Sequence, residues 1–433
     1  MKLQKLIDRF NEPETHLMVS AWPEKESNHG IAWYTKLVTT AQARRHGVRF
    51  VVLAERGADN RPRLYERGRI LVLRVFDNTH HSLYPTILTW LGIFSRVRSV
   101  MVHSEFGVNA GLVHYLLLIP FLALIRLAGR QVTYFAHNVI TDVSFLRDHL
   151  NVGDNPYKTD LLNLAVKLHT NILTKLAHRV AVLDDVLKRR LARMIPGLDV
   201  VTLTIPVEPK RTAVSKREAR RRLGLPVAKP VIMAFGFLSP YKGTDWLVSA
   251  FNAWTNRRKT ASPMTLVLAG GPAHSLADRP YYKKWYEQLL TMVDHNPTIR
   301  LTGFVPEKDI PMYFAAADLV VLPYRGIMGA SGVLTHILSY RKPFMVSTAM
   351  KEAIKSKKFP VNRMIFDVDA AGIAKIYRTL QSNKHMRSLT AIARAIEKKR
   401  AVEQESDREY TLLYSSTHEI ARIQPRFRLA WAH

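Results

Sequence analysis

Short apolar segments alternate with amphipathic helical segments along almost the whole chain, and this alternation constrains the fold more than any other feature of the sequence. A strand, a helix and another strand form the repeating unit of parallel sheets that are covered by helices. A helix-length segment at residues 31–46 lies between the first two strand-like segments of the first series, which comprises 16–21, 49–54, 69–74, 99–103, 131–137, 179–183 and 200–205. This half predicts one doubly wound α/β unit.

A second series of the same kind follows Pro206. Its strand-like segments are 230–235, 264–269, 299–302, 319–322, 343–347 and 364–366, and its helical segments are 246–255, 279–294, 311–317 and 333–340. The sequence thus predicts two tandem Rossmann-like domains, at 1–207 and 208–400, and a C-terminal helical segment, 401–433, that crosses back to the first domain. Such a tandem places a ligand cleft between the carboxyl edges of the two sheets.

The composition limits the classes of function. Of the 433 residues, 64 are Lys or Arg and 35 are Asp or Glu, which gives a net charge of +29. Nucleic acid, an anionic membrane surface and a phosphorylated substrate are all acidic enough to be partners. No nucleic-acid-binding module is recognisable and aromatic residues do not alternate with the basic runs, so we expect no nucleic acid. The absence of cysteine excludes disulfides, thiolate metal sites and a cysteine nucleophile.

Two segments bear on membranes and location. The first ten residues are charged and amphipathic and lack the apolar core of a signal peptide, so we expect a cytoplasmic protein. Residues 115–125 form the most apolar stretch, which is shorter than the roughly 18 to 20 residues that a membrane span needs. This stretch predicts a buried or interfacial helix, and we expect peripheral contact with the anionic inner face of the membrane.

The strongest local signal lies at residues 234–251, where a strand runs into a loop and then a helix. Gly236 lets a ligand approach the backbone, Lys242 supplies a positive charge, and a helix from about Thr244 offers free N–H groups. This pattern suits a phosphorylated ligand. The alternative is an ordinary strand-loop-helix junction with a solvent-exposed lysine.

A second segment with this chemistry spans residues 322–347. Ser331, Gly332 and Val333 stand where another helix begins directly after a strand, so a second helix N-terminus is available to a phosphate. Arg325 adds a candidate bidentate phosphate contact. The alternative is a small-residue cap that serves packing alone.

These segments, taken in order, carry a resemblance to a known family. Lys242-Gly243, residues 266–272, residues 301–324 and the run from Ser331 to Ser347 resemble the donor-binding domain of glycosyltransferase family 4, which has the GT-B fold. Residues 29–53 resemble the family's glycine loop, first helix and second strand. Residues 133–138 resemble the segment that bears its active-site-facing histidine.

The resemblance implies a retaining transfer of a sugar from a nucleotide diphosphate sugar, generally without a metal and without a separate cofactor. By position, Lys242 matches the residue that holds the donor diphosphate, Gly30 matches the loop glycine near the donor phosphates, and His137 matches a residue near the transferred sugar. Gly332 and Val333 match the amides of the phosphate-facing helix. Our hypothesis is transfer to a glycan or lipid-linked acceptor in cell-surface polysaccharide or glycolipid synthesis. Asn138 is either an acceptor contact or a turn residue.

Three positions depart from the family pattern. Phe237 stands where an arginine is common, and Met328 and His336 stand where two glutamates are common. Arg325 or Arg341 can replace the missing arginine, and His336 can still bond a hydroxyl group. A retaining front-face mechanism needs no protein base, because the leaving phosphate accepts the acceptor's proton. The competing hypothesis is a catalytically silent GT-B protein that binds nucleotide sugar or glycan within a complex.

The remaining polar residues carry less information. Asp184 and Asp185 follow a strand, and we expect at least one of them to cap a helix. The 17 histidines, among them His103, show no metal-ligand spacing, so we predict no metal site.

Overall fold

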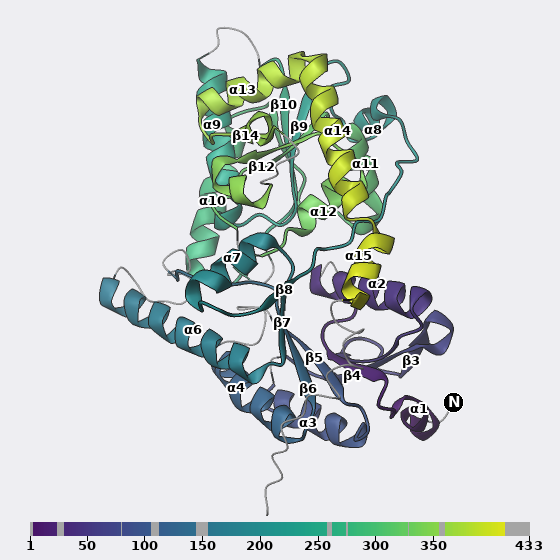
Figure 1. The fold of residues 1–433 in the computed structure, drawn as a ribbon. Coiled ribbons are helices and arrows are strands. Elements are labelled where there is room, and N and C mark those ends of the chain that lie inside the picture. Colours follow the sequence, from purple (N-terminus) through teal and green to yellow (C-terminus); the bar gives the residue numbers. More distant parts are fainter. Residues whose placement is uncertain are drawn as a thin grey trace, which may run out of the picture.

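The computed structural model describes residues 3–23, 30–78, 80–104, 112–143, 155–257, 262–273, 276–327, 329–354 and 360–411. Within them the chain forms two parallel-type sheets, each covered by helices, that lie one after the other along the molecule (Figure 1). The predicted fold class, α/β with two tandem Rossmann-like units, is confirmed.

The N-terminal sheet has the strand order β3-β4-β2-β1-β5-β6-β7-β8. Its neighbouring strands are parallel except for the short edge strand β3, which is antiparallel to β4. The strand order reverses at β1, which lies between β2 and β5. The strands are β1 (Thr15–Val19), β2 (Arg49–Glu55), β3 (Arg63–Tyr65), β4 (Ile70–Phe76), β5 (Ser99–Ser104), β6 (Gln131–Ala136), β7 (Arg179–Val182) and β8 (Val200–Thr202).

Helices cover both faces of this sheet. Because successive side chains of a strand point to opposite faces, Leu17 and Val51 pack into one apolar cluster while Met18 and Phe50 pack into another. The first cluster is closed by α1 (Leu3–Phe10), α3 (Leu83–Ile93), α4 (Leu112–Leu127), α6 (Pro156–Leu176) and α7 (Asp185–Met194), and the second by α2 (Gly30–Arg45). A short 3-10 turn, η1 (Glu66–Gly68), precedes β4.

The C-terminal sheet is entirely parallel, with the order β11-β10-β9-β12-β13-β14 and a reversal at β9. Its strands are β9 (Val231–Phe235), β10 (Thr265–Ala269), β11 (Ile299–Leu301), β12 (Leu319–Leu322), β13 (Phe344–Ser347) and β14 (Ile365–Phe366). Its helices are α8 (Lys216–Arg222), α9 (Thr244–Asn256), α10 (Pro280–Asp294), α11 (Ile310–Ala316), α12 (Gly332–Ser339), α13 (Ala370–Gln381) and α14 (Asn383–Lys399), with 3-10 turns η3 (Pro240–Lys242), η5 (Glu307–Asp309), η6 (Thr348–Ala353) and η7 (Val361–Met364). Both faces of this sheet contribute to one large apolar cluster.

After α14 the chain returns to the N-terminal sheet. Helix α15 (Val402–Glu409) lies against α2 (Figure 1), and Gln42 Nε2 donates to the carbonyl of Ser406 at 2.7 Å. The chain passes between the two domains twice, once after β8 and once after α14. These two segments lie side by side, because the amide of Val207 donates to the carbonyl of Arg400 at 2.7 Å. The two sheets are therefore joined twice at one place.

The predicted strands and the four predicted C-terminal helices are present with small shifts of their ends, but the sequence missed β3, which has only three residues. Asp184 caps α7 by accepting from the amide of Val186 at 2.7 Å, which confirms the predicted cap. The predicted C-terminal helical segment, 401–433, contains α15, and its part beyond 411 lies outside the described residues. None of the helices in the described ranges has the length and apolar character needed to cross a membrane.

Candidate active site

The loop after β9 and the start of α12 meet around one point. Gly236 has a φ of +101°, a left-handed value that favours glycine. A Cβ atom on Gly236 would lie 3.0 Å from Cγ2 of Val333 and 3.4 Å from Nζ of Lys242. The three residues that the sequence singled out from two separate segments therefore lie together at the reversal point of the C-terminal sheet.

The N-terminus of α12 adds amide dipoles to this point. Ser331 is the N-cap, and its Oγ accepts from the amide of Leu334 at 3.2 Å. The first N–H groups of a helix have no acceptor within the helix, so the amides of Gly332 and Val333 are available to a ligand. The positive end of the helix dipole favours an anion there.

Lys242 brings an amino group to the same point. It ends η3, directly before Gly243, whose φ is +65°. A Cβ on Gly243 would lie 2.1 Å from the carbonyl oxygen of Pro323, so the close approach of the two loops requires glycine there. Burial lowers the pKa of Lys242 to about 8, because desolvation disfavours the charged amine. A diphosphate in this position would raise this pKa again, because a nearby negative charge favours the protonated amine.

Arg325 has a different partner from the expected phosphate. Its guanidinium pairs with the carboxylate of Asp245 at 2.6 Å and 3.0 Å and lies 4.1 Å from the ring centre of Trp246. Asp245 is in the first turn of α9, so the start of that helix already faces an acidic group. Of the two helix N-termini, that of α12 is therefore the one suited to bind an anion, whereas Asp245 at the N-terminus of α9 pairs with Arg325. Donor contact by Arg325 stays a prediction.

The positions that depart from the family pattern have aromatic or buried surroundings. Phe237 stacks on Phe304 with ring centres 6.1 Å apart. His336 lies between Phe235 and Phe314, and burial, reinforced by Lys210, lowers its pKa to about 4, so that it is neutral. Met328 lies outside the described residues.

Arg341 also has a carboxylate partner, and its replacement of the missing arginine stays a prediction. Its Nε donates to Glu397 at 3.1 Å, and its φ of +52° is held by the turn after α12. Both candidate arginines, Arg325 and Arg341, therefore already pair with a carboxylate.

His137 and Asn138, which follow β6 of the N-terminal sheet, contact the loop that precedes α12. Asn138 forms an antiparallel bridge with Gly329, and a Cβ on Gly329 would lie only 2.5 Å from the carbonyl oxygen of His137. The next residue, Ala330, packs against the apolar cluster beneath α2. The segment just before α12 thus touches the carboxyl end of β6.

A second histidine, which the sequence analysis considered only as a metal ligand, completes this group. Nδ1 of His103, at the end of β5, is 2.8 Å from Nε2 of His137. Tyr34 of α2 meets the His137 ring edge-on at 5.8 Å. The signal was present in the sequence, since His103 and Ser104 are polar residues at the carboxyl end of an otherwise apolar strand, beside the strand that leads to His137.

Gly30 is the first residue of α2, one turn before Tyr34. It is exposed, and a Cβ there would meet none of its described neighbours within 4 Å. Its proximity to donor phosphates stays a prediction.

The described residues contain no group of three or more His, Asp or Glu side chains arranged to hold a metal ion. Independence of a metal and of a cofactor remains a prediction.

Comparisons with known proteins agree with this geometry. The family model described as "Glycosyl transferases group 1" matches residues 229–383, which contain β9 to β14 and α12. D-inositol 3-phosphate glycosyltransferase of Salinispora arenicola is 34% identical over 129 residues, which are 30% of this chain and 28% of that protein. The same enzyme of Corynebacterium urealyticum is 30% identical over 31% of this chain and 30% of its own length. The chain thus spans less than a third of the length of the curated relatives it matches.

Solved structures match over a larger part of the chain. Anabaena HepE, in a complex with UDP and glucose, has a TM-score of 0.64 at 16% identity, with 93% of this chain and 100% of that chain covered. Sucrose-phosphate synthase from Thermosynechococcus elongatus has a TM-score of 0.67 at 16% identity and covers 95% of this chain and 100% of its own. At such identities the likeness shows the fold. The chain has the GT-B fold, and its residues 229–383 match the family model of the group 1 glycosyltransferases.

Proposed function

We propose that the protein is a retaining glycosyltransferase that moves a sugar from a nucleotide diphosphate sugar to a glycan or lipid-linked acceptor, in cell-surface polysaccharide or glycolipid synthesis. The observation that carries the proposal is the convergence of Gly236, Lys242 and Val333 at the start of α12. One ammonium group and two free amides around a glycine form a site for a diphosphate.

These groups have a clear task in the transfer. The bond between the anomeric carbon and the β-phosphate oxygen breaks, and the carbon forms a bond to an acceptor hydroxyl on the same face of the sugar. The hydroxyl proton passes to the leaving phosphate, so no protein base is required. Lys242 and the amides of Gly332 and Val333 stabilise the negative charge that develops on the diphosphate. His137 precedes Asn138, which bridges to Gly329 just before α12, so His137 is our candidate for holding the transferred sugar.

The relatives suggest the first donor to test. HepE has been solved with UDP-glucose, and the curated relatives are named glycosyltransferases. We therefore expect UDP or GDP, and their sugars, to raise the thermal unfolding temperature. Lys242→Ala should abolish this diphosphate-dependent shift. Lys283→Ala, which removes an exposed lysine of α10, is the matched control and should retain it. An unchanged shift in Lys242→Ala would remove Lys242 from the site.

A specific observation keeps a second function open, namely a catalytically silent GT-B protein that binds nucleotide sugar or glycan within a complex. Phe237 and His336 are packed among aromatic rings and offer no carboxylate or guanidinium to the donor. Release of free nucleotide from UDP- and GDP-sugars in the presence of acceptor separates the two functions. Binding without any release over a panel of donors and acceptors would favour the silent protein.

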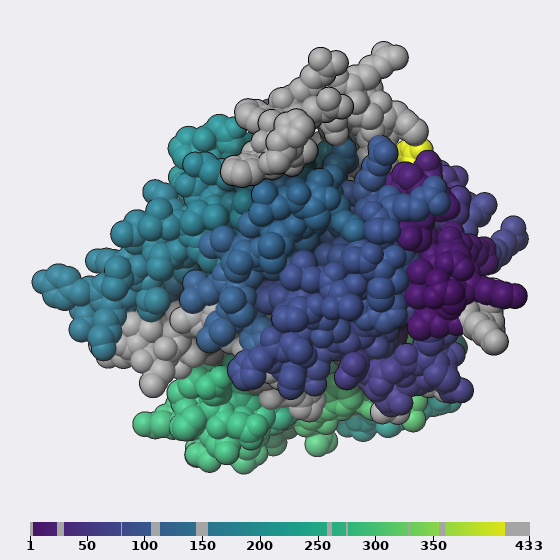
Figure 2. Space-filling model, turned by 90° about the horizontal axis from the view of Figure 1, so that it is seen from below, coloured from purple at the N-terminus to yellow at the C-terminus, as the bar shows by residue number. Residues whose placement is uncertain are grey.

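The proposed membrane contact gains a defined surface from α4 and α6, which lie side by side on the face shown in Figure 2. Both helices expose large apolar side chains, namely Val113, Leu116, Leu117, Leu124, Leu127, Tyr157, Leu161, Leu164, Leu168 and Ile172. We call these ten residues the apolar face. Exposed basic residues accompany it, namely Arg126, Lys158, Lys167 and Lys175, against one acidic residue, Asp160. An apolar surface with a basic surround is suited to the anionic cytoplasmic leaflet.

Sedimentation with vesicles tests this contact. The protein should bind vesicles that contain phosphatidylglycerol at low salt and bind phosphatidylcholine vesicles much less. Leu161→Glu together with Leu168→Glu should abolish binding, while Val227→Glu, at an exposed apolar position in the C-terminal domain, should leave it intact. If the double variant instead converts a dimer to a monomer and vesicle binding is absent in the parent, the apolar face is an interface between two copies.

A further inference from the structure

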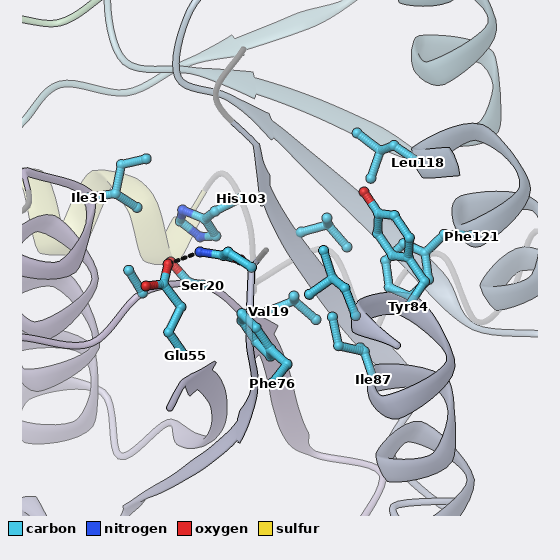
Figure 3. A pocket seen from close by; sticks show the side chains of 14 residues that line it. Val19, Ser20, Ile31, Glu55, Phe76, Tyr84, Ile87, His103, Leu118 and Phe121 are labelled. Atoms are coloured by element: carbon cyan, nitrogen blue, oxygen red, sulfur yellow. Dashed lines mark hydrogen bonds between the residues drawn. The ribbon is translucent and has the colours of Figure 1, made fainter. Parts of the chain in front are cut away.

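A pocket lies at the carboxyl edge of the N-terminal sheet, where the strand order reverses at β1. It encloses about 560 Å³, including the space that opens to solvent. Figure 3 shows that its two sides differ in chemistry. On one side are Ser20, Glu55 and His103, and on the other are apolar side chains of α3 and α4, namely Tyr84, Ile87, Leu118 and Phe121.

The polar side has one group that lacks a partner. Ser20 Oγ shares a hydrogen bond of 2.7 Å with Thr35, and Glu55 accepts from Asn78. His103 is only 8% exposed, and its Nε2 has no hydrogen-bond partner among the described residues. An unsatisfied buried ring nitrogen in a pocket wall is unfavourable until a ligand hydroxyl or water bonds it.

His103 also connects the pocket to the donor side. Its Nδ1 is 2.8 Å from Nε2 of His137, and the carbonyl of His137 lies against Gly329, two residues before the cap of α12. Burial and the neighbouring His137 hold the pKa of His103 well below its usual range, so the ring is neutral and Nε2 can accept or donate one hydrogen bond. A hydroxyl group at His103 therefore lies next to the histidine that faces the transferred sugar.

The charge of the lining selects against one class of acceptor. The described lining residues include no lysine or arginine, and Glu55 contributes a carboxyl group. A phosphate group placed here would lose its hydration and meet a group of like charge. The pocket thus differs from what a phosphorylated acceptor needs, although the curated relatives are named for D-inositol 3-phosphate.

We propose that this pocket binds the acceptor, and that the acceptor is an uncharged amphiphile whose apolar part lies against Ile87, Leu118 and Phe121 and whose hydroxyl group bonds His103. This inference rests on the proposed function, since it assigns the acceptor of the same transfer. The helix that supplies Leu118 and Phe121 carries Leu117 and Leu124 of the apolar face, so an acceptor anchored in a membrane would reach the pocket past α4.

Binding of octyl glucoside, measured by calorimetry below its micellar concentration, tests the pocket without any turnover. We expect octyl glucoside to bind and glucose 6-phosphate not to bind. Ile31→Trp places a large ring at the pocket wall and should weaken octyl glucoside binding by at least about tenfold. Val227→Trp, at an exposed position of the C-terminal domain, should leave it unchanged.

A titration with UDP on the same variants separates this inference from the proposed function. If UDP binds to the parent and to Ile31→Trp alike while octyl glucoside binding is lost, the pocket is the acceptor site. Octyl glucoside binding that survives Ile31→Trp, or tighter binding of glucose 6-phosphate, overturns the inference and leaves the donor site intact. Absence of UDP binding in the parent overturns the proposed function instead.

Discussion

The amino group of Lys242 determines how the proposed donor site responds to pH. Burial lowers its pKa to about 8, so the group is mainly protonated at neutral pH and loses its charge as the pH rises through that value. Because a diphosphate binds the charged form, the dissociation constant of UDP should rise above about pH 8, by up to about tenfold per pH unit. Calorimetric titrations from about pH 6.5 to about pH 9.5 measure this change.

Lys242→Arg is the control for this pH dependence. A guanidinium keeps its charge throughout the range, so the variant's UDP affinity, even if weaker, should be flat with pH. A parent protein whose UDP affinity does not change across the same range would contradict the assignment of Lys242 to the diphosphate.

A substitution at Gly236 tests whether the close packing of Gly236, Lys242 and Val333 is needed to bind the donor. An alanine there meets both a left-handed backbone and the contacts of its Cβ with Val333 and Lys242. Gly303→Ala is a matched control, because Gly303 has a φ of +71° but open space around a Cβ. Both variants should lose about 1 to 2 kcal/mol of unfolding free energy, and Gly236→Ala should in addition weaken UDP binding at least about tenfold. Equal UDP affinities would show that the Gly236 point does not hold the donor.

Among the secondary-structure elements, the regular alternation of the sequence predicted the strands and their parallel direction well, because each buried strand is a short apolar run. The sequence could not predict β3, whose Arg63 and Leu64 are exposed and lack the apolar signal. It also could not predict which helix start faces an anion. That choice depends on Asp245 and Arg325, which are 80 residues apart and meet only in the folded domain.

The site residues likewise divide into those that the local sequence predicts and those that it does not. Gly236, Lys242 and Val333 were predictable because each stands in a local strand-loop-helix pattern. The contact between His103 and His137 was not, since it requires the register of β5 beside β6. The spacing of residues along the sequence carries no information about such a contact between distant segments.

Helix α15 carries a buried carboxyl group that should give stability a pH dependence. Burial, reinforced by Glu405, raises the pKa of Glu409 from its ordinary value of 4.5 to about 8. Between these values the native state keeps the proton that the unfolded chain releases, so the unfolding free energy should fall as the pH rises from about 4.5 to about 8. Glu409→Gln should remove this part of the slope.

Urea denaturation at a series of pH values measures the effect. The variant should be more stable than the parent at about pH 8 and close to it near about pH 5. Asp407→Asn is the control on the same helix, because Asp407 is exposed and pairs with Arg45, so its loss should lower stability slightly and leave the slope below pH 8 in place. Parallel curves for the parent and Glu409→Gln would contradict the burial of an uncompensated carboxyl group.

At the scale of the whole molecule, the two sheets have to meet for a donor held in one domain to reach an acceptor held in the other. The adjacent segments at Val207 and Arg400 form one connection between the domains. The bridge of Asn138 with Gly329 forms a second connection, at the site itself. The ion pair of Arg189 with Glu352 also joins α7 to η6. A change confined to the second connection should therefore affect transfer more than folding or donor binding.

Gly329→Ala makes that change, because its Cβ would lie 2.5 Å from the carbonyl oxygen of His137 and the two domains must move apart to admit it. Gly326→Ala, three residues earlier in the same loop, places its Cβ in open space and is the matched control. We expect the transfer rate of Gly329→Ala to fall at least about tenfold while its UDP affinity changes by less than about threefold, because Lys242 and the amides of α12 belong to one domain. Small-angle scattering with UDP should show a larger radius of gyration for Gly329→Ala than for Gly326→Ala. Equal rates and equal radii would mean that the contact of His137 with Gly329 does not position the two domains for transfer.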